Sequence, residues 1–421
     1  MSFSVAQLGF PIQGAIVGRM PTQNRLAFWT CAAVLALALW TSGAATPVYP
    51  LYSADWHLTP FLTTSIFAVY PLVLVVVLLV FGDLSDAIGR RASILLGVVS
   101  SIVGVLLFAF APDVGWVLVG RAFMGLGVGL SLSPATAKMI DIAGPSNSAR
   151  TGAISTASTA VGLVFATLLG GALVQYAPFP LHLTYFVLLA VELVVLVLVW
   201  RLDRDRDPAA RRWRPRGISV PRSLWGAVAA AAVSISASYA LGAVVLSLGA
   251  SIGKQLIGSD NAFVTGAIIA VSMVVIGVVA LASRRIPLVV ALPIAFVATA
   301  LGFTSLVLAA SAHSLGLFLA FCVLAGIGYS LLFAGGLQIV GRFAPAHHRA
   351  GTLSAVYLVA YLVQGGTALW LGSEATAGGL AHAVDVGAPV IVGLALLALV
   401  FVVVLVRPRR GARSAAPVAV E

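Results

Sequence analysis

Charged residues are scarce in this chain of 421 residues. Asp, Glu, Lys and Arg together make up 9% of it, whereas a soluble domain contains roughly a quarter. Hydrophobic residues make up 61%, and the mean hydropathy is +1.09. This composition excludes an ordinary soluble domain, and the sequence therefore predicts an integral membrane protein.

Cysteine is almost absent, and two other signals are missing. Cys31 and Cys322 are the two cysteines, and both fall inside apolar runs, which excludes a disulfide framework and a cysteine-based metal site. A phosphate-binding G-x-x-x-x-G-K-[ST] loop does not occur, so we do not expect this chain alone to use ATP. The adjacent His347 and His348 are better explained as solvated loop residues than as metal ligands. We expect no cofactor, no metal and no enzymatic activity.

Long apolar runs are plentiful. Runs of about twenty apolar residues cross a bilayer as helices, whereas barrel strands would be about half as long and would alternate in polarity. Because backbone groups in lipid must be hydrogen-bonded within the protein, the sequence predicts an all-α membrane protein. Hydropathy places about twelve spans at residues 26–46, 61–81, 92–111, 115–137, 151–175, 181–200, 224–250, 262–282, 287–311, 315–340, 350–372 and 387–406.

The basic residues are distributed unevenly, and the net charge is +11. If both termini are cytoplasmic, all of the 24 Lys and Arg residues other than Lys254 and Arg121 fall on the cytoplasmic side, as the positive-inside rule requires. This rule explains the charge better than nucleic-acid binding does. The first 24 residues show no signal-peptide cleavage pattern, so we expect the first helix to be retained. The predicted location is the cell membrane (inner or plasma), crossed many times with both termini cytoplasmic, and no nucleic-acid partner is expected.

A polar segment divides the chain into two halves. Residues 201–223 are rich in Arg, Asp and Pro and are interpreted as a cytoplasmic linker, with binding of anionic lipid by its arginines as an alternative. The predicted organisation is a cytoplasmic tail (1–24), a first bundle of six helices (25–200), the linker, a second bundle (224–407) and a second cytoplasmic tail (408–421).

The two halves repeat each other. Gly125-Leu126-Gly127 in span four matches Gly326-Ile327-Gly328 in span ten, 201 residues later. The segment that opens span five at Arg150 matches the one that opens span eleven at Arg349, 199 residues later. The agreement of these offsets indicates duplication of a six-helix unit. We therefore predict two pseudo-symmetric bundles, related by an axis along the membrane normal, with a binding site between them.

The loop between spans two and three is charged and contains two glycines. It reads Gly82-Asp83-Leu84-Ser85-Asp86-Ala87-Ile88-Gly89-Arg90-Arg91, and the glycines allow a tight turn. This loop resembles the signature of the major facilitator superfamily, roughly G-x-x-x-D-x-x-G-R-R/K. The resemblance implies a transporter of twelve helices, most similar to the bacterial branch of drug:proton antiporters.

The resemblance also implies roles for the loop. Asp86 would dock on the start of helix eleven, near Arg349, where the helix dipole is positive, and would lock the outward-facing state. Arg90 would pair with Asp141, and Arg150 would complete the charge cluster. The alternative is that these charges only fix the topology. The predicted gating residues are Gly82, Asp86, Gly89, Arg90 and Arg91, and the predicted charge cluster is Asp141, Arg150 and Arg349.

Span four contains an arginine followed by spaced glycines. Arg121 precedes Gly125, Gly127 and Gly129, which resembles the R-x-x-x-G-x-G pattern of the family, where the arginine is implicated in proton coupling. An arginine inside a membrane is a functional candidate, although Arg121 lies near the outer end of its span and snorkelling to the interface is the alternative. The spaced glycines allow close packing of helices.

Span five keeps only part of a pattern that drug antiporters of this family often carry, G-x-x-x-G-P-x-x-G-G. Gly170 and Gly171 match its final pair, whereas Ala166 and Thr167 stand in place of Gly and Pro. The proline kink is therefore absent, which weakens the assignment to antiporters without excluding it.

Acidic residues are missing from the middle of spans one, four, seven and ten, which we expect to line the cavity. This argues against a strongly electrostatic cation site. Glu192 in span six is the only acid deep in a span and is a second candidate for carrying a proton, although span six is peripheral in this fold. The polar candidates for substrate contact are Thr41, Ser42, Ser131, Thr136, Ser236, Tyr239, Tyr329, Ser330, Tyr357, Tyr361 and Gln364.

These observations predict a secondary active transporter that works by alternating access. We expect proton-driven export of a small neutral or amphipathic compound, because the cavity candidates are Ser, Thr, Tyr and apolar residues. One alternative is a proton symporter or facilitator that imports a metabolite, and another is a lipid-handling or non-transporting membrane protein. The expected partners are a small-molecule substrate, protons and the lipid bilayer, and the expected state is a monomer.

Overall fold

The structure is a computed structural model that describes residues 22–144, 147–203, 221–283 and 286–406. In this part of the chain all regular structure is helical and no strand occurs, so the predicted all-α class is confirmed. The predicted tails (1–24 and 408–421) and linker (201–223) lie wholly or largely outside the described residues.

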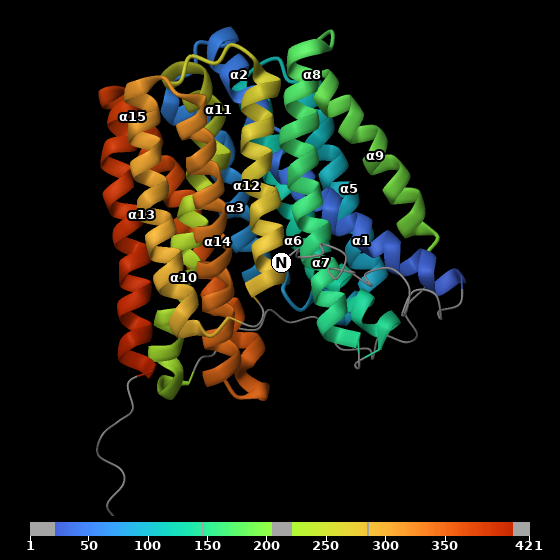
Figure 1. The fold of residues 1–421 in the computed structure, drawn as a ribbon. Coiled ribbons are helices and arrows are strands. Elements are labelled where there is room, and N and C mark those ends of the chain that lie inside the picture. The colour runs from blue at the N-terminus through green and yellow to red at the C-terminus, as the bar shows by residue number, and fades with distance from the viewer. Residues whose placement is uncertain (1–21, 145–146, 204–220, 284–285, 407–421) are drawn as a thin grey trace, which may run out of the picture.

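The first half of the chain forms six membrane-crossing passes (Figure 1). Five of them are α1 (Thr22–Gly43), α3 (Pro60–Phe81), α5 (Arg90–Ala109), α6 (Val114–Ala143) and α9 (Leu183–Trp200). Span five consists of α7 (Ser148–Val164) and α8 (Gly170–Tyr176), joined by a π-helical turn at Phe165–Leu169. Two short helices, α2 (Tyr49–Asp55) and α4 (Leu84–Ile88), lie in the connections.

The second half supplies the remaining passes. Its helices are α10 (Trp225–Ala243), α11 (Gly249–Ser251), α12 (Ala262–Ala282), α13 (Leu288–Ala312), α14 (Leu315–Phe343) and α15 (Ala346–Val406). The seventh pass is longer than the predicted 224–250, because it runs from α10 through two π-helical turns and α11 to Leu256.

The last helix contains two membrane passes. The described residues include 11 helices that are long and apolar enough to span a membrane, and the last of these covers Gly351–Val404. Gly379 interrupts it with φ +89°, a conformation that residues with a side chain rarely adopt. The sequence predicted a gap between residues 372 and 387, whereas the structure turns at this single glycine. Twelve passes result, as predicted.

One close helix contact recurs at equivalent positions of the two halves. In α6, a Cβ added at Gly125 would lie 2.8 Å from the carbonyl oxygen of Tyr70 in α3. In α14, a Cβ added at Gly326 would lie 2.8 Å from the carbonyl oxygen of Ser272 in α12. Helices four and two of one half therefore approach each other as closely as helices ten and eight of the other. The duplication seen in the sequence thus sets equivalent helix contacts.

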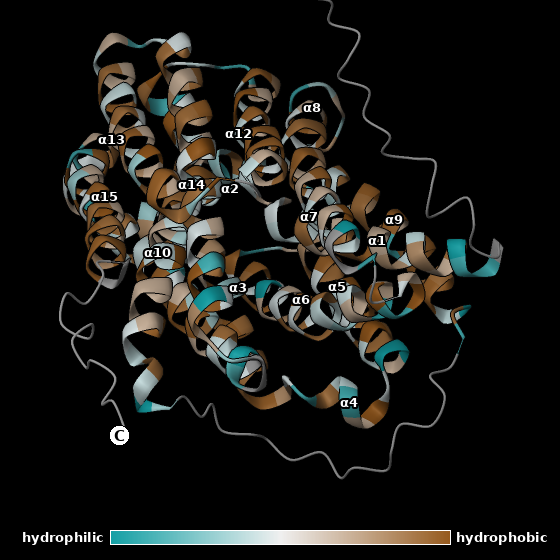
Figure 2. Ribbon diagram, turned by 60° about the horizontal axis from the view of Figure 1, so that its bottom comes forward, coloured by the Kyte–Doolittle hydropathy of each residue, from teal (hydrophilic) through white to brown (hydrophobic). Residues whose placement is uncertain are grey.

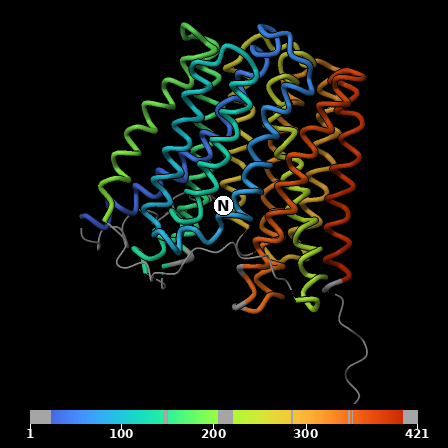
Figure 3. Tube along the Cα trace, turned by 180° about the vertical axis from the view of Figure 1, so that it is seen from behind, coloured from blue at the N-terminus to red at the C-terminus, as the bar shows by residue number. Residues whose placement is uncertain are grey.

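The halves meet along two pairs of helices, α3 with α15 and span five with α12. We call the end of the molecule that carries residues 82–91 the loop end and the end that carries Gly379 the turn end. Helices of the two halves stand close at the turn end and diverge toward the loop end (Figures 1 and 3). At the turn end the hydroxyl of Thr46 donates to the carbonyl oxygen of Leu246 at 2.9 Å, and the backbone N–H of Phe61 donates to the hydroxyl of Thr376 at 2.9 Å.

Hydropathy along the helices matches a bilayer setting. In Figure 2, which brings the loop end forward, apolar colour covers most of the helices and polar colour gathers at helix ends. Large apolar side chains such as Val194, Val278 and Val404 are exposed on the outside of the bundle. A soluble protein would not leave so many apolar side chains exposed, and lipid is the surrounding that fits them.

Candidate functional site

The loop between spans two and three folds into the short helix α4 and a glycine turn. Gly89 has φ +90° and is buried, and it directly precedes α5. The turn aims the next two side chains at neighbouring helices. Arg90 forms an ion pair with Asp141 near the end of α6, and Arg91 donates to the carbonyl oxygen of Trp200 at the end of α9. The loop is thus tied to spans four and six of its own half.

Asp86 of the predicted gating loop and Arg349 of the predicted charge cluster are not part of that ion pair. Asp86 is exposed on α4, and within the described residues its carboxylate has no hydrogen bond or ion pair with the start of α15. Arg349 is exposed and donates from Nη2 to the carbonyl oxygen of Gly341 at 3.1 Å, inside its own half. Arg150 is half-buried at the start of α7. The structure therefore brings Arg90 and Asp141 together and leaves Asp86 available at the loop end.

Arg121 is the largest fully buried side chain in the described part of the chain. Its Nη2 donates to the hydroxyl of Tyr49 at 2.8 Å, and its Nη1 donates to the carbonyl oxygen of Ser42 at 2.9 Å. The guanidinium also lies 5.6 Å from the ring centre of Phe108, a cation–π distance. The side chain therefore turns inward to α1 and α2 and does not snorkel to the interface.

The break in helix one makes this arrangement possible. Helix α1 ends at Gly43, a short 3-10 helix at Thr46–Val48 follows, and α2 begins at Tyr49. Proline at position 47 lies in the first turn of that short helix, where its missing N–H costs nothing. The chain thereby exposes the carbonyl oxygen of Ser42 and directs the hydroxyl of Tyr49 toward Arg121. Tyr49 and Phe108 carry no signal of this role in the sequence, and only their place beside Arg121 reveals it.

Glu192 is fully buried although its helix, α9, lies at the edge of the bundle. Its Oε1 lies 3.1 Å from the hydroxyl of Thr41 in α1, and its Oε2 has no hydrogen-bond partner among the described residues. The same Thr41 hydroxyl lies 2.9 Å from the carbonyl oxygen of Leu37. A hydroxyl has one proton to donate. When that proton goes to Leu37, the contact with Glu192 requires a proton on the carboxyl.

Thr41 also joins the two buried ionisable groups. Its carbonyl oxygen lies 3.4 Å from Nη1 of Arg121, and its hydroxyl contacts Glu192. Arg121 and Glu192 are thus connected through one residue of α1 without touching each other. We call Arg121, Thr41 and Glu192 the buried relay. It brings together the two coupling candidates that the sequence pointed to separately.

The glycines of α6 face two different neighbours. Added Cβ atoms at Gly125 and Gly129 would meet Tyr70 and Val77 of α3, whereas one at Gly127 would meet the carbonyl oxygen of Gly97 in α5 at 2.7 Å. In span five, a Cβ at Gly171 would lie 2.8 Å from the carbonyl oxygen of Ala262 in the other half, and one at Gly170 would lie 3.0 Å from the Pro47 side chain. Neighbouring chain segments approach closely at these positions.

Several hydroxyls among the substrate candidates donate hydrogen bonds to backbone carbonyl oxygens. Ser131 donates to Gly127 at 2.8 Å, Thr136 to Leu132 at 3.1 Å and Ser330 to Ile276 at 3.1 Å, in each case to a carbonyl oxygen. Together with Thr41, which belongs to the relay, these residues are already satisfied inside the helices. Backbone bonding of this kind is common for Ser and Thr in helices. They are weaker candidates for substrate contact than the tyrosines are.

The tyrosine candidates of the second half form one group with a residue that sequence analysis missed. Phe333, one turn after Tyr329 on α14, has its ring centre 6.1 Å from that of Tyr239 and 6.3 Å from that of Tyr357. Tyr361 lies 4.9 Å from Tyr239. Phe333 was overlooked because only polar side chains were selected from the apolar span. Its spacing of four residues from Tyr329 places both rings on one face of α14, but only the fold brings Phe333 opposite Tyr239.

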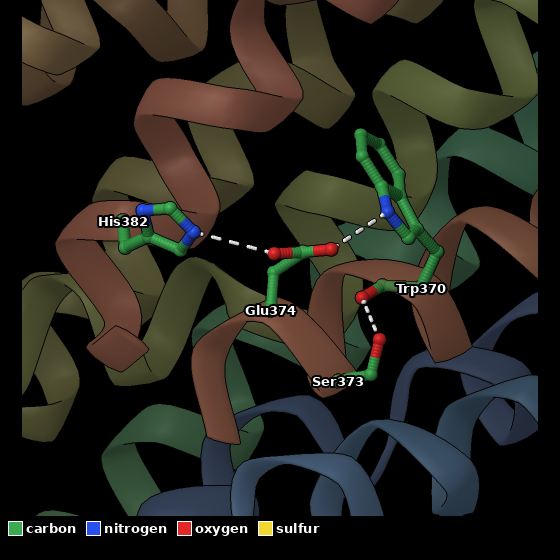
Figure 4. Close-up of polar contacts among 4 residues, drawn as sticks. All are labelled: Trp370, Ser373, Glu374 and His382. Atoms are coloured by element: carbon green, nitrogen blue, oxygen red, sulfur yellow. Dashed lines mark hydrogen bonds and ion pairs between the residues drawn. The ribbon is translucent and has the colours of Figure 1, made fainter. Parts of the chain in front are cut away.

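A separate polar group lies at the turn end, shown in Figure 4. Glu374 accepts from Nε1 of Trp370 at 3.1 Å and lies 3.3 Å from Nε2 of His382, across the break at Gly379. Ser373 donates to the carbonyl oxygen of Trp370 at 2.7 Å. The contact between Glu374 and His382 joins the two arms of α15 where the backbone turns.

A pocket of 140 Å³ lies between the halves at the turn end. Its lining includes Thr46 and Thr167 from the first half and Lys254, Asp260 and Thr265 from the second. The pocket lies beside the hydrogen bond from Thr46 to Leu246, so residues that hold the halves together at this end also line it.

Two pseudo-symmetric sets of six membrane-crossing helices, with buried ionisable groups inside the first set, define a membrane transporter of the alternating-access type. A family model described as Major Facilitator Superfamily matches residues 28–368. The chain belongs to the Major Facilitator Superfamily, as the loop at 82–91 indicated.

Curated relatives match only part of the chain. Over 203 residues it is 34% identical to the "Multidrug efflux pump LfrA" of Mycolicibacterium smegmatis, a match that covers 45% of this chain and 38% of that protein. Over 174 residues it is 24% identical to the "Uncharacterized MFS-type transporter YybF" of Bacillus subtilis, covering 41% and 42%. The chain thus matches less than half the length of these relatives.

Solved structures match over nearly the whole chain. The nucleoside transporter NupG superposes with a TM-score of 0.70 at 11% identity, covering 91% of this chain and 99% of that one. A bacterial homolog of the human lysosomal transporter Spinster, in an inward-facing and unoccupied conformation, gives 0.67 at 16% identity, covering 91% and 95%. At such identities these likenesses show the fold alone.

Proposed function

We propose that this protein exports small neutral or amphipathic compounds from the cell, driven by the proton-motive force. The single observation that supports it most is the buried relay of Arg121, Thr41 and Glu192. Ionisable groups inside a membrane are costly and are usually retained for function. A fully buried carboxyl whose contact with Thr41 fits its protonated form is suited to take up and release a proton.

The coupling step would use these residues in turn. With Glu192 protonated, its proton would be donated to the Thr41 hydroxyl, 3.1 Å away, while that hydroxyl donates to the carbonyl oxygen of Leu37 at 2.9 Å. Loss of the proton would leave a buried carboxylate with one hydrogen bond at most, an unfavourable state that a change in helix packing near α1 would relieve. Arg121 binds the carbonyl oxygen of Ser42, which follows Thr41 in α1. A change in the packing of α1 would therefore alter the contacts of Arg121. The electrical part of the driving force supplies about 2.3 kcal/mol per charge for each 100 mV.

The orientation and gating follow from the loop end. We place this end in the cytoplasm because nearly all Lys and Arg residues belong to it, and the protein in the cytoplasmic membrane. Asp86, exposed on α4, would close the loop end by docking at the start of α15 when the halves rock together. In the arrangement described here the halves are joined at the turn end, by Thr46 and Leu246 among others.

Export is favoured over import by the chemistry between the halves. The tyrosine group and Phe333 offer flat apolar faces and few charges, which suit amphipathic compounds better than sugars or charged metabolites. The efflux pump LfrA, the relative with 34% identity, supports the same direction. Import of a metabolite by symport or facilitation is the second candidate, because the nucleoside transporter NupG shares the fold. Lipid handling without substrate transport has no specific contact in its favour.

The test separates transport from its coupling to protons. We would reconstitute the wild type and Glu192→Gln into proteoliposomes and measure dye movement driven by a pH gradient, and dye exchange without a gradient. Glutamine imitates the protonated carboxyl, so we expect gradient-driven movement to be lost while exchange continues. The matched control is Glu374→Gln, which changes the acid at the turn end and should leave both unchanged. Gradient-driven transport by Glu192→Gln at the wild-type rate would reject the coupling role of Glu192. If the wild type takes up the dye and does not export it, the proposed direction of transport is wrong.

A further inference from the structure

Five aromatic side chains from three helices of the second half form one cluster. Tyr239 comes from α10, Tyr329 and Phe333 from α14, and Tyr357 and Tyr361 from α15, and neighbouring ring centres are 4.9 to 6.4 Å apart. Tyr239 lies 90 or more residues before the other four rings in the sequence, so the cluster is a product of the fold. Rings from three helices meet in it, so it is more than the packing contact of a single helix pair.

Three of these rings share one orientation. The planes of Tyr239, Tyr329 and Phe333 differ by 8° to 16°, and their centres are 6.1 to 6.3 Å apart. Parallel rings at this separation are offset and do not cover one another completely. We call Tyr239, Tyr329 and Phe333 the ring platform. A flat aromatic molecule would find parallel faces there on which to stack.

The cluster lies between the halves and not against lipid. Tyr361 packs with Ala38, Tyr70 and Leu74 of the first half, and the pass that contains Tyr239 is the most buried of the described membrane passes. Nevertheless Tyr329, Phe333, Tyr357 and Tyr361 are only half-buried. Their accessible surface therefore faces space within the protein, where a substrate could reach it.

An unpaired polar atom lies on the same helix face as the cluster. Gln364 follows Tyr361 by three residues and Tyr357 by seven, so these side chains share one side of α15. The Gln364 side chain is 9% exposed, and its Oε1 has no hydrogen-bond partner among the described residues. The hydroxyl of Ser236, three residues before Tyr239 and 3% exposed, is likewise unpaired there. Buried polar atoms without partners are rare in folded proteins, and a ligand that bonds them explains their retention.

We infer that the ring platform and Gln364 bind planar aromatic compounds that carry an N–H donor. The flat rings of the compound stack on Tyr239, Tyr329 and Phe333, and its N–H donates to the amide oxygen of Gln364. A single delocalised positive charge on the compound adds a cation–π attraction to the rings, although recognition does not require one. This inference names the substrate class of the proposed exporter and rests on that proposed function.

The first test measures binding and does not depend on transport. Purified protein in lipid nanodiscs is titrated with aminoacridine, which is planar, fluorescent and carries an N–H donor, and the Kd is compared between the wild type and Phe333→Leu. Loss of one stacking ring should weaken binding about three- to tenfold. The matched control is Phe303→Leu, an aromatic of the same half that packs on Phe321 at 5.7 Å, away from the platform. Equal effects of the two substitutions would overturn the assignment.

A second variant tests the hydrogen bond and controls for folding. Gln364→Leu is titrated with aminoacridine and with N-methylacridinium, a planar cation that has no N–H donor. We expect about a three- to tenfold weaker Kd for aminoacridine and no change for N-methylacridinium, whose binding also shows that the site is intact. The same change for both dyes, or for neither, would refute the role of Gln364. Strong competition by tetraphenylphosphonium, which is not planar, would refute the preference for flat compounds.

The outcomes keep this inference distinct from the proposed function. If the wild type binds aminoacridine, Phe333→Leu binds it more weakly and cells export no dye, then the function is wrong and the site stands. If cells export the dye and Phe333→Leu exports it at the wild-type rate and affinity, then the platform is wrong and the function stands. A wild type that binds none of the planar dyes overturns the inference.

Discussion

The carboxyl of Glu192 and the hydroxyl of Thr41 lie 3.1 Å apart in the buried interior, although one residue belongs to span six and the other to span one. Both residues are fully buried. The carboxyl oxygen that does not face Thr41 has no partner among the described residues, so Thr41 supplies the one hydrogen bond given to this group. A proton carrier inside a membrane protein depends on such a partner, because every change of its charge must be compensated locally.

Removing the hydroxyl of Thr41 should therefore impair coupling. Thr41→Val keeps the shape of the side chain and leaves Glu192 without its partner, which costs about 1–3 kcal/mol for a buried polar group. We expect gradient-driven transport to fall by about tenfold while exchange without a gradient continues, and Thr41→Ser to restore the driven rate. The control is Thr299→Val, because Thr299 is also buried and its hydroxyl bonds to the carbonyl oxygen of Ala295 in its own helix. Equal loss in both valine variants would count against the relay.

Tyr49 should matter more for stability than a neighbouring tyrosine does. Its hydroxyl accepts from the buried guanidinium of Arg121 at 2.8 Å, whereas the hydroxyl of Tyr52 bonds to that of Tyr185 at 3.1 Å. A hydrogen bond to a charged group contributes about 1.5–3 kcal/mol and a neutral one about 0.5–1.5 kcal/mol. Tyr49→Phe should thus lower the free energy of unfolding more than Tyr52→Phe does. Denaturant unfolding of both variants in the same detergent would measure the difference, and the reverse order would contradict the central place of Arg121.

Much of the architecture could be predicted from the sequence. The number of apolar runs long enough to cross a bilayer indicates the number of membrane passes. The repeated segments at Gly125 and Gly326 indicate the division into two equivalent halves. These features are local or periodic, so one sequence displays them. The break at Gly379 was predicted less well, because a single glycine with positive φ interrupts a segment whose composition on both sides favours helix.

The site was harder to predict, for a physical reason. Helix α9 is apolar on all sides, so hydropathy does not reveal which side faces the protein, and Glu192 was assigned to the edge of the bundle. Contacts such as the one with Thr41 join residues 151 positions apart and depend on the rotation of both helices. Phe333 was missed because an apolar ring in an apolar span carries no signal until Tyr239 is placed opposite it.

Glycine in α6 should be required at the position that faces α3. At Gly125 an added Cβ would lie 2.8 Å from the backbone oxygen of Tyr70, and backbone cannot move aside as a flexible side chain does. Overpacking of this kind costs about 1–3 kcal/mol. The control is Gly152→Ala in α7, where an added Cβ meets nothing within 4 Å and where alanine favours helix by about 1 kcal/mol. Thermal unfolding should show Gly125→Ala melting lower than the wild type and Gly152→Ala melting no lower. Similar melting of both variants would show that α6 and α3 are packed more loosely than described.

The ion pair between Arg90 and Asp141 should affect the transport cycle without contributing much to stability. The two side chains are 31% and 59% exposed, and exposed pairs contribute about 0–1 kcal/mol. Asp141→Asn should therefore leave the unfolding transition close to that of the wild type.

Because Arg90 follows the turn at Gly89, its pairing fixes the direction of α4 and hence the position of Asp86. We expect Asp141→Asn and Asp86→Asn each to reduce dye export severalfold, and the double variant to be no slower than the slower single one, since both act on closure of the loop end. Dye export from efflux-deficient cells at matched protein levels measures this. If the double variant instead lost export by the product of the two single losses, the ion pair and Asp86 would not serve one gate.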